Sequence, residues 1–243
     1  MPIGQHTIHL KQVTSTNDIA WAYTGDKKNH GLMVVADEQT AGRGRRGDVW
    51  VSPPGSALYM SILLHPELAI RRPVMLTIWA GLGVCQVIQK ALSIKPQLKW
   101  PNDVLIDGKK VSGILVEQRQ EWFVVGVGLN VNVPVQHFHA ASVHQAGSLQ
   151  DFTKHVLNRS EVLSALQSEW NQLFTLLVTG KTEPILELWK KYSGLVGHSV
   201  NLEAHGKQEV GTLHTLRWEE IVIESEGKLF AFQPEAVTRL VTT

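Results

Sequence analysis

Residues 73–92 are apolar at helical spacing over a stretch long enough for a core helix. Segments with the short apolar or alternating pattern of β-strands surround it, at residues 8–13, 32–36, 57–64, 98–100, 104–106, 109–118 and 122–129. Asp107 and Gly108 predict a tight hairpin between two of these strands. Further helices are predicted after the capping residues 15–18, and over residues 153–174 and 184–192.

The pattern changes after Gly194. Five short strand-like runs follow it, separated by glycines and charges, at residues 199–202, 210–216, 221–223, 229–232 and 237–241. Such spacing predicts a small antiparallel barrel with a boundary near Gly194. Residues 134–147 have weak periodicity and predict a surface loop. Their His137, His139 and His144 make a metal site conceivable, but no Cys or acidic ligand accompanies them.

The chain of 243 residues is long enough to bury a substantial core without disulfides. Its single cysteine, Cys85, lies in an apolar segment, so we expect a buried thiol, no internal disulfide and a reducing compartment. No uninterrupted apolar run reaches the roughly 18 residues expected of a membrane span, and residues 1–10 lack the pattern of a signal peptide. These features predict a cytoplasmic protein without a membrane partner.

The most distinctive short segment is a basic glycine loop that spells Gly42, Arg43, Gly44, Arg45, Arg46 and Gly47. Glycines let a backbone approach a ligand closely, and guanidinium groups match phosphate or carboxylate oxygens. The loop lacks the Gly-Lys-Ser/Thr ending of a Walker loop. A solvated basic turn or an RNA-binding segment are the alternatives, and the net charge of +1 argues against the second. Because the guanidinium groups repel one another, we expect the loop to order over a bound anion.

Three other segments carry polar groups suited to a cleft. Lys99, Trp100, Pro101, Asn102 and Asp103 form a turn between strands, and Lys110 on the return strand could point back toward Asp103. In residues 126–132, Gly126 and Gly128 are a sign of close approach by a ligand, and Asn130 and Asn132 follow them. Ser15, Thr16 and Asn17 offer hydroxyl and amide groups at a helix start. Each segment also has a purely structural interpretation. Residues 99–110 could be a turn with an exposed lysine, residues 126–132 an ordinary strand, and residues 15–17 a helix cap.

Taken together and in this order, the segments resemble the biotin–protein ligases. The resemblance runs over roughly residues 10–193, and its motifs are residues 15–17, 39–47 with Trp50, 99–103, 110–115 and 128–132. It implies an α+β fold: a catalytic domain around a mixed β-sheet with flanking helices, like class II synthetases, over residues 1–193, then an SH3-like barrel over residues 194–243. A Gly-Glu pair common near the family's last strand reads Pro234-Glu235 here, so the barrel matches less well.

The resemblance also implies a reaction. ATP and biotin form biotinyl-5′-AMP, and a lysine of the biotin carboxyl carrier protein of acetyl-CoA carboxylase then takes the biotinyl group. Mg²⁺ would be held mainly by phosphate oxygens rather than by a protein cage. The implied catalytic residues are Arg45, Lys110 and Asp103. The implied biotin-binding residues are Ser15, Thr16, Asn17, Gln39, Arg43, Gly44, Arg45, Lys110 and Gly113. The implied ATP or adenylate contacts are Arg43, Arg45, Arg46, Trp50, Asn102, Lys110 and Asn130.

Two rival functions remain open at this stage. The first is a lipoate or octanoate ligase, which shares the fold and a target lysine; the glycine–arginine loop and residues 99–103 favour biotin. The second is a non-enzymatic biotin sensor or an RNA-binding module. Ser15 leaves no room in this sequence for an N-terminal DNA-binding domain, so we expect no DNA binding. The family contains monomers and dimers, and a homodimer stays open.

Overall fold

A mixed seven-stranded sheet is the centre of the fold. The computed structural model describes residues 2–47, 49–50, 52–65, 72–141, 145–153 and 155–243, without the side chains of Arg46, His139 and Ala140. The strands are β1 (Thr7–Val13), β2 (Met33–Gln39), β3 (Ala57–Leu64), β4 (Gln97–Lys99), β5 (Asp103–Ile106), β6 (Lys109–Arg119) and β7 (Trp122–Asn130). Their spatial order is β1-β2-β3-β7-β6-β5-β4. Only β1 and β2 pair in parallel, so the predicted mixed sheet is confirmed.

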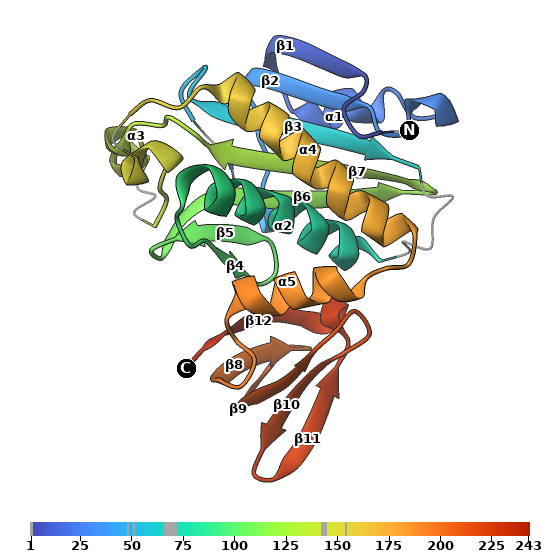
Figure 1. The fold of residues 1–243 in the computed structure, drawn as a ribbon, viewed down its shortest axis with the longest axis vertical. Helices are drawn as coiled ribbons and strands as arrows, with labels where there is room; N and C mark the ends of the chain where they lie inside the picture. The colour runs from blue at the N-terminus through green and yellow to red at the C-terminus, as the bar shows by residue number, and fades with distance from the viewer. Residues whose placement is uncertain (1, 48, 51, 66–71, 142–144, 154) are drawn as a thin grey trace.

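Helices α2 (Pro73–Leu92) and α4 (Arg159–Val178) lie across one face of this sheet (Figure 1). They pack closely because Trp79 and Trp170 each donate an indole hydrogen bond to the backbone of the other helix, both at 3.0 Å. Gly83 makes room for this contact: a Cβ there would lie 2.2 Å from the Trp170 ring. Helix α1 (Thr16–Trp21) lies by β2, β3 and β7, and α5 (Glu183–Ser193) follows α4.

Helix α2 also passes a length-and-composition test for a membrane span. About 67% of its apolar window is buried inside the fold, which is the condition of a core helix. Cys85 on this helix is fully buried, as expected, and its burial raises the pKa of the thiol.

Two expectations about the middle of the chain were wrong. Residues 134–147 contain a short helix, α3 (Val135–Ala140), and its Phe138 is buried. One buried apolar residue in a polar segment does not produce a helical pattern of hydrophobicity in the sequence. His144 and the side chain of His139 lie outside the described residues. The next long helix does not begin at residue 153 but at Arg159, where the Asn158 side chain caps it by accepting from the Ser160 N–H.

The C-terminal strands form a separate antiparallel sheet, as predicted. Its members are β8 (Ser199–Ala204), β9 (Lys207–Leu216), β10 (Ile221–Ser225), β11 (Lys228–Phe232) and β12 (Val237–Thr242), in the order β11-β10-β9-β8-β12. Three tryptophans join it to the first sheet. The Trp189 ring stacks between Trp100 and Trp218, with centroids 5.7 and 5.3 Å away. Trp100 Nε1 also donates to the Val237 carbonyl at 2.9 Å. The turn at residues 100–103 is therefore anchored on the C-terminal sheet.

We predict that Trp218→Ala lowers the free energy of unfolding by about 3–5 kcal/mol, because it removes one buried ring of the stack. Leu229→Ala is the matched control, since this side chain of the same sheet is 62% exposed; we expect a change below about 0.5 kcal/mol there. Chemical denaturation monitored by circular dichroism measures both. Equal effects of the two substitutions would show that the stack does not join the sheets.

Candidate functional site

A cleft of about 570 Å³ lies on the face of the sheet opposite helix α2. Side chains alternate along the strands, so Ile114 and Val127 join the core under α2 while Gly113 and Gly128 face the cleft. The predicted residues that line it are Ser15, Thr16, Asn17, Gln39, Arg43, Gly44, Arg45, Trp50, Asn102, Asp103, Lys110, Gly113 and Asn130. The structure thus brings together segments more than 100 residues apart. Arg46 was predicted with them, but its side chain lies outside the described residues.

Glycines in two neighbouring rows of strand partners make the floor of the cleft. In one row Tyr59, Gly128 and Gly113 are register partners on β3, β7 and β6. The Trp50 ring lies on it: a Cβ at Gly128 or Gly113 would come within 2.7 or 2.8 Å of the ring. In the neighbouring row, Gly126 plays the same part for Asn17, with 2.5 Å to its Oδ1. The glycines were predicted to admit a ligand closely; they admit two side chains of the protein itself.

Hydroxyl and amide groups form a network at one end of the cleft. The Gln39 Oε1 accepts from the Thr16 backbone N–H at 2.7 Å and from the Thr16 hydroxyl at 3.0 Å. Fully buried Ser61 lies 2.7 Å from the Thr16 hydroxyl and donates to Asn17 Oδ1 at 2.6 Å. Ser15 stands at the N-cap, but its side chain makes no capping bond. The expected cap is therefore corrected: Gln39, not Ser15, satisfies the first N–H of helix α1.

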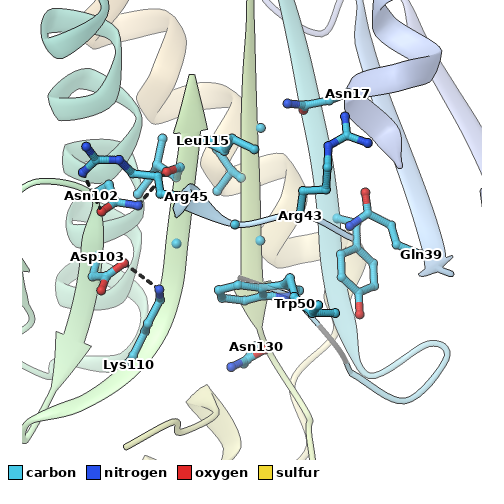
Figure 2. A pocket seen from close by; sticks show the side chains of 18 of the residues that line it. Asn17, Gln39, Arg43, Arg45, Trp50, Asn102, Asp103, Lys110, Leu115 and Asn130 are labelled. Atoms are coloured by element: carbon cyan, nitrogen blue, oxygen red, sulfur yellow. Dashed lines mark hydrogen bonds and ion pairs between the residues drawn. The ribbon is translucent and has the colours of Figure 1, made fainter. Parts of the chain in front are cut away.

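Arg43 points toward this same end and binds acidic side chains (Figure 2). It donates to both oxygens of Asp18, at 2.7 and 3.0 Å, and lies 3.6 Å from Glu117. The hydrogen bond from Arg43 holds the pKa of Asp18 below its usual value. Arg43 thus has a counter-ion within the protein, on helix α1, and the ordering of the loop over a bound anion stays a prediction.

The opposite end of the cleft is cationic. Lys110 Nζ lies 2.7 Å from Asp103 Oδ1, which confirms that Lys110 points back toward Asp103. The same ammonium is 5.4 Å from the centre of the Trp50 ring, within range of a cation–π contact. Arg45 donates to Asn102 at 3.4 Å. Figure 2 shows Arg43 and Arg45 directed to opposite sides of the cleft, so the loop divides its charge between the two ends.

Asn130 closes the cleft beside Trp50. Its Nδ2 donates to the Gly147 carbonyl at 2.9 Å, and its Oδ1 accepts from Ser52 at 3.2 Å. Residues 145–147 are in turn held by backbone bonds to Lys110. Trp50 Nε1 is buried and has no hydrogen-bond partner among the described residues, which leaves one donor in the wall of the cleft.

Several residues of the cleft were missed by the sequence reasoning. Apolar members such as Tyr59 and Phe138 carry no motif, and Thr238 comes from β12, about 90 residues after Ala146, the preceding lining position. Asp18 and Glu117, the partners of Arg43, lie inside a helix and a strand. The spacing of these two residues along the chain does not indicate that they meet Arg43. Only the alternation of side chains along β6, which puts Glu117 on the same face as Gly113 and Leu115, could have indicated that Glu117 lies near the cleft.

Among the described residues, no group of three or more His, Cys, Asp or Glu side chains is placed to hold a metal ion. The cleft has a polar end rich in hydrogen-bond acceptors and an opposite end with Lys110 and Arg45. The ring of Trp50 lies between the two ends. Such a cleft suits a neutral heterocycle at one end and phosphate groups at the other.

Known proteins give the same picture. The biotin/lipoate A/B protein ligase family matches residues 9–133. The bifunctional ligase/repressor BirA of Bacillus spizizenii is 32% identical over 244 residues, which cover 98% of this chain and 73% of that protein. The biotin–[acetyl-CoA-carboxylase] ligase of Mycobacterium tuberculosis is 31% identical over 207 residues, 83% of this chain and 76% of that protein.

A solved structure agrees over the whole chain. It is the biotin protein ligase from Aquifex aeolicus in complex with biotin and ATP, with a TM-score of 0.84, 28% identity, and coverage of 98% of this chain and 100% of that one. This match includes both sheets, and it confirms the predicted α+β class. The chain belongs to the biotin/lipoate A/B protein ligase family, on its biotin–protein ligase branch, and is a ligase enzyme.

Proposed function

We propose that the chain joins biotin to ATP as biotinyl-5′-AMP and then transfers the biotinyl group to a lysine of a biotin carboxyl carrier protein. The observation that carries this is the two-ended cleft. Its network of Gln39, Thr16 and Asn17 offers donors and acceptors for a cyclic urea, and Lys110 and Arg45 offer charge for a carboxylate and a phosphate. The Aquifex aeolicus relative was solved with biotin and ATP, which supports the same pair of substrates here.

In the first step a carboxylate oxygen of biotin attacks the α-phosphorus of ATP, and pyrophosphate leaves. Both reactants are anions, so cations must offset their repulsion and the charge that develops at phosphorus. We assign this role to Lys110 because it lies beside Trp50, on which we propose that the adenine ring stacks. Without substrate its charge is paired with Asp103 at 2.7 Å. An incoming phosphate would compete with Asp103 for the ammonium.

In the second step the amine of the carrier lysine attacks the acyl carbon, an amide forms and AMP leaves. The amine must first lose a proton. We assign this proton transfer to Asp103, the last residue of the turn at residues 100–103. Its carboxylate loses its partner when a phosphate draws Lys110 away. Mg²⁺ would be bound by phosphate oxygens and share their charge; the described residues offer no cage for it. We place the reaction in the cytoplasm, where the carrier protein would meet the enzyme.

We predict that ATP–pyrophosphate exchange depends on biotin and not on lipoate. The polar end supplies hydrogen bonds that a dithiolane ring cannot make, and the loss of such bonds lowers kcat/KM for a rejected substrate by orders of magnitude. Exchange of labelled pyrophosphate with each acid, side by side, measures this. Stimulation by lipoate with indifference to biotin would move the chain to the lipoate ligases.

Lys110→Ala should lower the rate of biotin-dependent exchange by about 100-fold or more, because it removes the cation next to the reacting phosphate. Lys109→Ala is the matched control: this lysine is the preceding residue of β6, is exposed and does not line the cleft. Circular dichroism checks that both variants fold. A Lys110→Ala enzyme with the exchange rate of the control would remove Lys110 from the first step.

Two alanine substitutions on β7 should separate the two ends of the cleft. A Cβ at position 126 would lie 2.5 Å from Asn17, and one at position 128 would lie 2.7 Å from Trp50. We expect Gly126→Ala to raise the KM for biotin by about tenfold, and Gly128→Ala to raise the KM for ATP by about as much, since each displaces one side chain. Steady-state exchange kinetics with each substrate varied in turn measures the split. The same change of both KM values in both variants would contradict this assignment of the ends.

A further inference from the structure

We propose that Glu117 is a positioning residue that fixes which end of the Asn17 side-chain amide faces the biotin-binding end of the cleft. This rests on the proposed function. Glu117 lies on β6, two residues beyond Leu115, and its carboxylate is partly buried. Its Oε2 accepts from Asn17 Nδ2 at 3.1 Å and from Trp21 Nε1 at 2.8 Å. The carboxylate therefore holds the start and the end of helix α1 at once.

The direction of the Asn17 amide follows from its two partners. An ionised carboxylate can only accept hydrogen bonds, so the NH₂ group must face Glu117. On the other side, Ser61 donates to Asn17 Oδ1 at 2.6 Å. A flipped amide would set its oxygen against the carboxylate in a place where only 3% of the residue is exposed, and it would break both bonds. The oxygen is thus locked toward Ser61, Gly126 and the cleft.

This orientation has a chemical consequence for the ligand. One lone pair of Asn17 Oδ1 is used by Ser61, and the other remains available as an acceptor at the polar end of the cleft. An acceptor at that point selects a ring N–H of a cyclic urea and rejects a ring nitrogen that carries a methyl group. Glu117 would therefore act on specificity without touching the substrate.

Glu117 also reaches the glycine–arginine loop. Its Oε1 lies 3.6 Å from Arg43, the residue that Asp18 holds from the other side. The substitution Glu117→Gln separates the two contacts, because a Gln oxygen can replace Oε2 toward Asn17 and Trp21 while the NH₂ group replaces the charge that faces Arg43. Glu117→Leu removes both contacts. Asp18→Asn is the matched control, since it weakens the hold on Arg43 and leaves the contacts of Asn17 in place.

The test measures KM and kcat for biotin and for its ring-N-methyl analogues, with KM for ATP, in all three variants. We expect Glu117→Leu to raise the KM for biotin by about tenfold or more, because a charge-assisted bond that orients the amide is lost. Its kcat and its KM for ATP should change less than about threefold, and its preference for biotin over the methylated analogues should fall. Glu117→Gln should restore the KM and the preference. Asp18→Asn should keep the preference of the unaltered chain.

An unchanged KM for biotin in Glu117→Leu would overturn the proposal, and so would a loss of preference in Asp18→Asn equal to that in Glu117→Leu, because the effect would then come from Arg43. A readout without substrate keeps this separate from the proposed function. The side-chain NH₂ signals of Asn17 and the indole N–H signal of Trp21 in ¹⁵N-resolved NMR should move in Glu117→Leu and stay close to their positions in Glu117→Gln. Unmoved signals in Glu117→Leu would overturn the positioning role, whereas a lack of biotin-dependent exchange in the unaltered chain would overturn only the proposed reaction.

Discussion

The absence of side chains at Gly113, Gly126 and Gly128 is the constraint on which the rest of the site depends. A strand residue with a Cβ at any of these positions would meet Trp50 or Asn17 at 2.8 Å or less. Because the floor is flat, an indole ring and an amide can lie directly on the sheet, and both are held by their own partners around it. The glycines weaken the strands in which they stand. Full pairing of β7 with β3 and β6 along its length offsets that weakness.

The charges of the glycine–arginine loop are divided by partners that belong to the sheet and to helix α1. Arg43 is bound by Asp18 and lies near Glu117, whereas Arg45 contacts Asn102 on the far side. Three guanidinium groups on neighbouring residues would repel one another if they all faced one ligand. With Arg43 neutralised inside the protein, the net positive charge toward the phosphate end comes from Arg45 and Lys110. Asp103 offsets part of this charge, so the cations act locally at one end of the cleft, in keeping with a net charge of +1 for the chain.

Local sequence patterns predicted the helices and strands. The contacts between side chains that lie far apart in the sequence are known only from the structure. Helix α2 was predicted at the bounds at which it is found, because its apolar pattern starts at Pro73, a favoured first residue of a helix. The hairpin between β5 and β6 was predicted because an Asp-Gly pair favours positive φ in a tight turn, and Asp107 and Gly108 take φ values of 48° and 77°. The interaction of Arg43 with Asp18 could not be predicted, since an acidic residue near a helix start is equally well explained by the helix dipole. Resemblance to a family found the cleft residues that carry motifs, and missed Glu117 and Thr238, which carry none.

The C-terminal sheet contributes to the site through one side chain and one anchor. Thr238 lines the cleft, and the preceding residue, Val237, accepts the indole hydrogen bond of Trp100. Trp100 is two residues before Asn102 and three before Asp103, so the position of the turn that bears both polar groups is set by the backbone of β12. Lys110 lies on the other strand of the same hairpin, and its backbone is also hydrogen-bonded to residues 145–147. The 2.7 Å ion pair between Asp103 and Lys110 therefore lies within one β-hairpin whose two strands have different additional anchors. The tryptophan stack that fixes one sheet against the other thus acts on the Asp103 strand of this hairpin, through Trp100.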